Sequence, residues 1–195
     1  MHGHIETTLT HAIRLAARGV HVSPGFGFNK GLCGCKNPYC WRPGKHPFVQ
    51  EEPSLSSVDE EEITSMWTAK NLNLVVHTGL KSSLLVIDVD HRDGGLDRYQ
   101  AQMSCLPLFT DTFSVRSGSG GLHFYFECDE DIPSCRDGVG QGIDICSNPT
   151  PGIITSYVIG PGSSHVSGKT YEILNDLPFL TINQKQIDEL RSLVN

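Results

Sequence analysis

The chain has 195 residues, of which 38% are hydrophobic and 19% are charged, a composition typical of a globular protein with one core. No stretch approaches the roughly 20 apolar residues of a membrane span, and the N-terminus lacks the pattern of a signal peptide, so we expect a cytoplasmic protein with no membrane partner. The formal charge of −7 argues against a protein that coats nucleic acid by bulk electrostatics. Any contact with nucleic acid would have to be local or helped by metal ions.

The first predicted element is an amphipathic helix over residues 9–17, which Gly19 ends. A strand follows at VHVSP. Residues 25–53 are rich in Gly, Pro and Cys and form a long irregular excursion, which needs something to hold it together. Ser57 and Glu60 then have the spacing of a capping box and predict the start of a short helix.

The rest of the chain mixes strands and helices without strict alternation, which predicts an α+β (mixed α/β) fold. The strand SSLLVIDVD is apolar on both faces and is therefore predicted to be central in its sheet. One helix is predicted at GGLDRYQAQM and a closing helix over residues 183–194. Further strands are predicted at NLVVHTG, TFSVRS, LHFYFEC, GIDIC, YVIG and KTYEIL.

Three aspartates interrupt otherwise apolar strands. Asp88 and Asp90 are two residues apart, so their side chains point to the same face, and Asp144 lies between two isoleucines in GIDIC. Burying an isolated carboxylate is costly, and Mg²⁺ and Mn²⁺ prefer oxygen ligands, so the three residues predict a site for such ions. In the alternative interpretation, Asp88 only ends its strand as a cap or turn residue before RDGG.

A glycine-rich turn precedes the strand LHFYFEC. Ser119, Gly120 and Gly121 have little side-chain bulk, so their backbone N–H groups can approach an anion closely. His123 follows on the next strand and shares one face of it with Tyr125. We predict that this face is polar, so that His123 can hydrogen-bond phosphate there. An ordinary hairpin with a satisfied histidine is the alternative interpretation.

Seven cysteines are an odd number, and three of them lie within eight residues, which favours a reducing compartment and a metal site over disulfides. Cys33, Cys35, Cys40 and His46 have the spacing C-x-C-x4-C-x5-H, and a Cys3His set is a standard structural zinc shell. The alternative is three free cysteines in a loop, although this loop has little apolar material to bury them. Lys45 can reach an anionic substrate or remain a solvated surface lysine.

The segment YVIGPGSSHVSGKTYEI repeats the arrangement of the glycine-rich turn. A strand leads into a Gly-Pro-Gly turn, and Ser163 and His165 precede another strand. Hydroxyl, imidazole and turn amide groups thus gather where a triphosphate can bind. A surface hairpin without such a role is the alternative interpretation.

In this order, the segments resemble the primase-polymerase domain of the archaeo-eukaryotic primase superfamily. The resemblance is specifically to the bifunctional DNA primase/polymerase N-terminal family of phages, plasmids and bacteria. It runs from HAIRLAARGVHVSP through PGKHP, NLVVHTG, LLVIDVD, SGSGGLHFYF and GIDIC to YVIGPGSSHVSGKTYEI. Order and spacing carry it, rather than any single motif.

The resemblance implies roles for the residues at matching positions. In that family a D-x-D pair and a later aspartate bind the catalytic dications, which places this role on Asp88, Asp90 and Asp144. Many members also carry a Cys/His cluster before K-x-P, where Lys45 lies. The family's nucleotide-binding elements S-G-G-x-H and G-S-x-H fall on Ser119, Gly120, Gly121, His123, Gly162, Ser163 and His165.

The resemblance further implies one catalytic domain over residues 1–195, with an N-terminal α/β lobe, a zinc-stapled insertion at about 25–53 and an RRM-like lobe over about 72–175. The active site is expected in the cleft between the sheets of the two lobes. There, NTP or dNTP would be joined on a single-stranded DNA template with two Mg²⁺ or Mn²⁺ ions, while Zn²⁺ would be structural. A helicase domain or protein is a further expected partner.

One departure from the family concerns the residues after the third aspartate. The family commonly has Ile-Arg-Gly there, whereas this chain has Ile145, Cys146 and Ser147. The missing positive charge would have to come from elsewhere, and Arg116 and Arg136 are the candidates.

Two functions of other classes stay open at this point. A non-catalytic zinc-containing module that binds single-stranded DNA in a replication protein would need basic and aromatic residues along a groove. A metal-dependent phosphatase or nuclease built on the D-x-D strand would release phosphate or shorten DNA.

Overall fold

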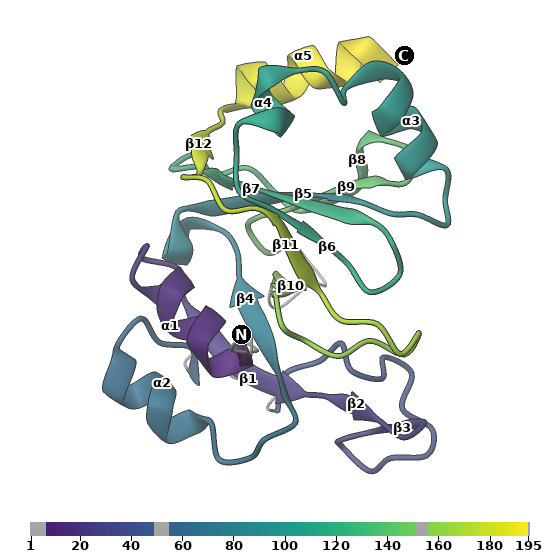
Figure 1. The fold of residues 1–195 in the computed structure, drawn as a ribbon. Helices are drawn as coiled ribbons and strands as arrows, with labels where there is room; N and C mark the ends of the chain where they lie inside the picture. The colour runs from purple at the N-terminus through teal and green to yellow at the C-terminus, as the bar shows by residue number, and fades with distance from the viewer. Residues whose placement is uncertain (1–6, 49–54, 151–155, 195) are drawn as a thin grey trace, which may run out of the picture.

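The structure is a computed structural model, and it describes residues 7–48, 55–150 and 156–194. Helices and antiparallel sheets are mixed along the chain, which confirms the predicted α+β class. Figure 1 shows a small sheet with helices α1 and α2 beside it, and a larger sheet covered by helices α3, α4 and α5. Within the described residues, no helix is long and apolar enough to cross a membrane.

The small sheet has three strands, with β4 (Leu72–His77) between β1 (Val22–Phe26) and β10 (Tyr157–Ile159). Both neighbours of β4 run antiparallel to it. Helices α1 (Thr8–Ala16) and α2 (Glu60–Met66) pack beside this sheet and against each other. Every residue of β4 is buried, because helices cover one side of the strand and the large sheet lies toward the other.

The start of helix α2 differs from the prediction. Its N-cap is Asp59, whose carboxylate accepts the backbone N–H of Glu62 at 2.9 Å, so the capping box of Ser57 and Glu60 is wrong. Ser57 instead donates its hydroxyl to the Glu62 carboxylate. Aspartate caps a helix as well as serine does, and the aspartate two residues further on took the position.

The large sheet has β5 (Leu84–Val89) at its centre, between β7 (Leu122–Glu127) and β9 (Ile143–Cys146). This position confirms the prediction for SSLLVIDVD. The outer strands are β6 (Ser114–Arg116), β8 (Cys135–Gly140), β11 (Glu172–Asn175) and β12 (Leu180–Thr181).

Both faces of the large sheet are buried. One face packs against α3 (Gly95–Gln102), the short α4 (Pro107–Thr110) and α5 (Gln184–Val194) through a core that includes Ile87. The other face forms a second core with the small sheet and its helices. Tyr125 on that face is fully buried, so the prediction of a polar face on this strand is wrong.

The predicted excursion contains a small hairpin that the sequence did not suggest, formed by β2 (Phe28–Asn29) and β3 (Leu32–Cys33). Lys30 and Gly31 connect the strands with φ angles of +49° and +82°, the left-handed pair typical of a two-residue hairpin turn. The last residues assigned to this excursion, 49–53, lie outside the described residues. The predicted division of the chain into these parts stays a prediction.

The central position of β5 makes its side chains critical for stability. We expect Ile87→Ala to lower the free energy of unfolding by about 3 kcal/mol, because Ile87 is fully buried and truncation leaves a cavity. Urea denaturation would measure this loss. Leu174→Ala is the control, since Leu174 in β11 is 44% exposed, and it should cost less than about 1 kcal/mol. A similar loss for both variants would contradict the central role of β5.

Candidate functional site

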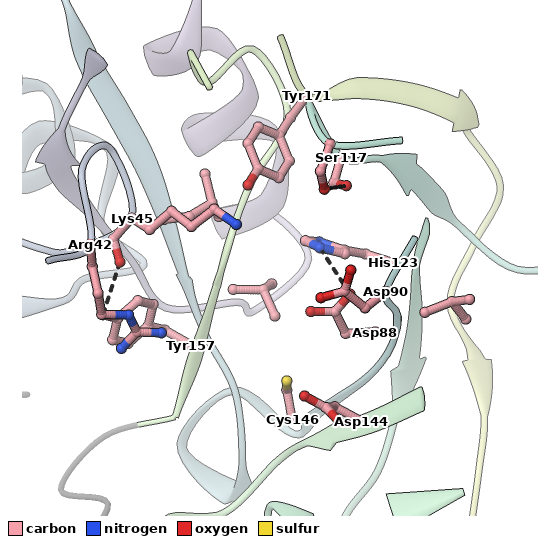
Figure 2. A pocket seen from close by; sticks show the side chains of 14 residues that line it. Arg42, Lys45, Asp88, Asp90, Ser117, His123, Asp144, Cys146, Tyr157 and Tyr171 are labelled. Atoms are coloured by element: carbon pink, nitrogen blue, oxygen red, sulfur yellow. Dashed lines mark hydrogen bonds and ion pairs between the residues drawn. The ribbon is translucent and has the colours of Figure 1, made fainter. Parts of the chain in front are cut away.

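A polar cavity of about 190 Å³ lies where the inner face of the large sheet meets β10 and the cysteine-rich loop. Figure 2 shows its lining side chains. Asp88, Asp90 and Asp144 lie on one side of the cavity and Lys45 extends from the opposite side. The structure thus brings the three predicted aspartates to one cavity.

Strand register places the aspartates there. Asp88 in β5 is directly opposite Asp144 in β9, and on its other side it is directly opposite His123 in β7. Side chains directly opposite on neighbouring strands point to the same face of a sheet. Asp90 follows one residue after the end of β5 and also lines the cavity. The antiparallel pairing therefore unites residues that are 56 positions apart in the sequence.

Hydrogen bonds to backbone N–H groups hold two of the carboxylates. Asp144 accepts the N–H of Asp137 at 2.8 Å, and Asp90 accepts the N–H of Arg92 at 2.8 Å. The Asp90 bond spans two residues, which is the turn geometry proposed as the alternative for Asp88. It leaves the second oxygen of Asp90 beside the Arg92 guanidinium at 3.5 Å.

The carboxylates differ in their electrostatic environment. Burial raises the pKa of Asp144, the Asp137 N–H opposes this rise, and the negative charge of Asp88 adds to it. Burial also acts to raise the pKa of Asp90, but the hydrogen bonds and charge of Arg92 and then the charge of Lys45 outweigh it, so the net shift is downward. Asp144 and Asp88 therefore repel each other, and a cation between them would relieve that repulsion.

His123 is buried at the floor of the cavity. Its Nε2 lies 3.5 Å from Asp88 Oδ1, and its Nδ1 has no hydrogen-bond partner within the described part of the chain. Burial lowers the pKa of His123, and the Asp88 charge only partly opposes this. We therefore treat His123 as neutral at pH 7, so that its contact with Asp88 is not an ion pair.

The glycine-rich turn reaches the cavity through its serines. Ser119 lines the cavity, and its hydroxyl lies 2.9 Å from that of Ser117. Gly120, with φ +98°, uses its N–H to close the turn onto the carbonyl of Ser117. A Cβ at Gly121 would lie 2.4 Å from the carbonyl oxygen of Val89, so only glycine fits against the end of β5. The two glycines shape this turn and do not line the cavity.

The second predicted segment lines the cavity at its two ends, through Tyr157 and Tyr171, but its central residues lie behind the wall. Ser163 is fully buried, and its hydroxyl accepts the backbone N–H of Leu74 at 2.9 Å. His165 packs beneath the glycine-rich turn, with Nδ1 3.0 Å from the hydroxyl of Ser167, which in turn donates to the carbonyl of Gly118. Neither Ser163 nor His165 lines the cavity. Their binding of nucleotide stays a prediction.

The predicted zinc ligands form a compact cluster. Ligand atoms of Cys33, Cys35, Cys40 and His46 all lie within 4.8 Å of one another, as they do in no other group of three or more such side chains in the described residues. His46 Nε2 is 3.5 Å from Cys33 Sγ and 3.4 Å from Cys40 Sγ. Its Nδ1 lies 3.1 Å from the carbonyl oxygen of Pro47, the kind of contact that orients a metal-binding imidazole.

The thiols of this cluster titrate as a group. Burial acts to raise the pKa of Cys33, but hydrogen bonds from Cys35 and Gly44 outweigh it and lower the pKa. Burial raises the pKa of Cys40, and the neighbouring thiols Cys35 and Cys33 add to the rise. One thiolate thus forms readily while a second is disfavoured. A bound dication would favour the thiolate form of both cysteines, so the donor set fits zinc.

Sequence reasoning missed several residues of the cavity wall. Arg42 lines it from between two zinc ligands, and Tyr157 and Tyr171 contribute aromatic rings. Cys146, which stands where the family usually has arginine, lines it as a neutral thiol, because burial and then the Asp88 charge raise its pKa well above the usual value. The C-x4-C-x5-H spacing identifies ligands but not the direction of the residues between them, so the sequence contained no signal for Arg42.

The two arginines considered as replacements for the missing charge are not in this cavity. Arg116 is exposed on β6, and Arg136 lines a neighbouring cavity of about 270 Å³. That second cavity shares Arg42, Asp144 and Cys146 with the first. Arg42 therefore lines the candidate site, whereas Arg92 contacts Asp90 without lining the cavity.

The repulsion between Asp88 and Asp144 gives a prediction on stability. In buffer without dications at pH 7, Asp144→Asn should raise the free energy of unfolding by about 0.5–1 kcal/mol, since the amide oxygen can still accept the Asp137 N–H. Asp129→Asn, on an exposed turn, is the control and should change little.

The pH dependence of this gain follows from the raised pKa of Asp144. Because the folded state raises the pKa of Asp144, this residue stabilises the fold at pH values below its unfolded-state pKa of about 4. The stabilisation is lost as the pH rises through the folded-state pKa. The advantage of the asparagine should therefore disappear below about pH 4. Thermal denaturation at both pH values measures this, and an Asp144→Asn protein less stable than wild type at pH 7 would contradict it.

The cysteine cluster predicts one bound zinc ion per chain. Cys40→Ser should weaken zinc binding by at least about 100-fold, because a hydroxyl is a poor substitute for a thiolate ligand. Cys105→Ser, an exposed cysteine outside the cluster, should leave binding unchanged. Competition with a chromophoric chelator measures both affinities. Equal zinc binding by the two variants would rule out this cluster as the zinc site.

A comparison with protein families agrees with this geometry. The model of the family described as bifunctional DNA primase/polymerase, N-terminal, matches residues 12–190, nearly the whole chain. No curated protein matches the chain. The family match spans the zinc ligands, the three aspartates and the glycine-rich turn. The chain therefore belongs to the bifunctional DNA primase/polymerase N-terminal family, which supports a nucleotidyltransferase of the primase/polymerase type acting on DNA and nucleotides.

Proposed function

We propose that this protein is a DNA-directed primase/polymerase that joins NTP or dNTP on a single-stranded DNA template and releases pyrophosphate, in the replication of a phage, plasmid or bacterial element. The observation that carries the proposal is the convergence of Asp88, Asp90 and Asp144 on one cavity in a chain of this family. A helicase partner stays a prediction.

The three carboxylates would hold two Mg²⁺ or Mn²⁺ ions. Their fit rests on the oxygen-only donor set and on the repulsion between Asp88 and Asp144, which cations would offset. Bound there, the two ions would activate a 3′-hydroxyl and stabilise the leaving pyrophosphate. Asp90 is fixed by the Arg92 N–H and Asp144 by the Asp137 N–H, so both can present an oxygen without reorganisation.

Neutral and cationic groups around the carboxylates would hold the nucleotide. His123 lies at the cavity floor, where its imidazole can donate or accept a hydrogen bond. Lys45 extends over the same space, and Ser119 adds a hydroxyl. Together they would position and neutralise a triphosphate whose reacting phosphate lies near the aspartates.

The aspartates give the decisive test. Asp88→Ala and Asp90→Ala should each reduce template-directed nucleotide incorporation more than about 100-fold, because each removes a metal ligand, while the protein stays folded. Asp129→Ala, which changes an exposed aspartate outside the cavity, should retain wild-type incorporation. The assay uses labelled nucleotides, single-stranded template and Mn²⁺ or Mg²⁺, with and without primer.

The products separate this proposal from its rivals. A polymerase lengthens DNA and releases pyrophosphate, whereas a phosphatase or nuclease releases phosphate or shortens DNA. A non-catalytic module would bind single-stranded DNA without incorporating nucleotides. Undiminished synthesis by either aspartate variant would refute the assignment of the metal ligands.

A further inference from the structure

The two cations of the cavity wall are the two ends of one turn. Residues Arg42, Pro43, Gly44 and Lys45 form it, closed by a hydrogen bond from the Lys45 N–H to the Arg42 carbonyl at 3.0 Å. Proline at the second position and glycine with φ +73° at the third are the signature of a type II turn. Figure 2 shows both cationic side chains on the side of the cavity opposite the aspartates, with Lys45 extending toward them and Arg42 lying beside the Tyr157 ring.

This turn is bonded to the zinc cluster at its third position. The backbone N–H of Gly44 donates to the sulfur of Cys33 at 3.4 Å. His46 follows Lys45 directly. The turn is therefore flanked by predicted zinc ligands in sequence and hydrogen-bonded to one of them in space.

The small sheet holds the other side of the same turn. Tyr157 in β10 donates its hydroxyl to the Lys45 carbonyl at 3.1 Å, and Asn73 in β4 donates to the Gly44 carbonyl at 2.8 Å. The Arg42 guanidinium carbon lies 5.8 Å from the centroid of the Tyr157 ring. The turn thus contacts the metal cluster on one side and the small sheet on the other.

We propose that zinc at the Cys3His cluster sets the affinity for the triphosphate of the incoming nucleotide, because it fixes the turn that presents Arg42 and Lys45 to the cavity. In this arrangement Arg42 supplies the positive charge that Cys146 does not. The identity of the ligand as a triphosphate rests on the proposed function. The zinc loop is then part of the substrate site, in addition to stabilising the fold.

Binding of a fluorescent ATP analogue in the presence of Mg²⁺ and without template tests this inference independently of DNA synthesis. With zinc bound, Arg42→Ala should weaken binding about 5- to 10-fold, as expected for the loss of one charge-assisted contact at a partly exposed site. Arg116→Ala removes an exposed arginine outside the cavity and is the matched control, with binding unchanged.

Zinc removal completes a thermodynamic cycle. A zinc-selective chelator should weaken ATP binding by wild type at least about 5-fold, but should add little to the Arg42→Ala, Lys45→Ala double variant, because zinc acts through these two side chains. Circular dichroism checks that the chain stays folded. An equal effect of zinc removal on wild type and on the double variant would overturn the proposal.

Tyr157→Phe provides a test that leaves the metal in place. It removes the hydrogen bond to the Lys45 carbonyl but keeps the ring, so ATP binding should weaken about 3-fold at unchanged zinc content. Wild-type affinity in this variant would contradict the coupling through the turn.

An Arg42→Ala protein with normal ATP binding and weaker binding of single-stranded DNA would assign Arg42 to the nucleic acid instead. A wild-type protein that binds ATP in this way but makes no DNA would refute only the proposed function.

Discussion

The arrangement of this site depends on the antiparallel pairing that puts Asp88 directly opposite Asp144. Two carboxylates in that position repel each other, and burial adds to the cost of charging Asp144. The backbone N–H of Asp137 and the positive charge of Arg136 offset part of this cost. A fold that retains such repulsion is suited to binding cations, since dications at the same place convert it into attraction.

The pairing is fixed because β5 is buried on both faces. A shift of one residue in β5 would turn Ile87 toward the cavity and Asp88 into the core beneath helices α3 and α5. The cost of burying that carboxylate excludes the alternative register. The same core that stabilises the sheet therefore also positions the catalytic candidates, and Gly121 completes the arrangement by letting the glycine-rich turn pack onto the end of β5.

The cysteine-rich loop has few buried apolar side chains of its own, and we expect a metal at the Cys3His cluster to hold it together. Tyr39 and Trp41, its largest side chains, are 89% and 78% exposed, so they contribute little to holding it together. Within the described residues, hydrogen bonds to Asn73 and Ser164 also hold this loop in place beside the ligand cluster. Ser164 belongs to the segment that the sequence suggested as a nucleotide site, and its hydroxyl instead accepts the Phe28 N–H of the hairpin in this loop. The middle of that segment thus supports the cavity wall from behind, while Tyr157 and Tyr171 at its ends belong to the wall.

Local patterns in the sequence determined the α+β class, the central strand, the Cys3His cluster and the three aspartates of the cavity, because periodicity, ligand spacing and a charge within an apolar strand are all short-range signals. Only the tertiary structure decided that Tyr125 is buried, that Asp59 rather than Ser57 caps α2, and that Ser163 lies behind the wall while Arg42 lies in it. These outcomes depend on which elements pack against a residue from elsewhere in the chain. The side of a strand or the direction of a loop residue is set by that packing, and no local pattern encodes it.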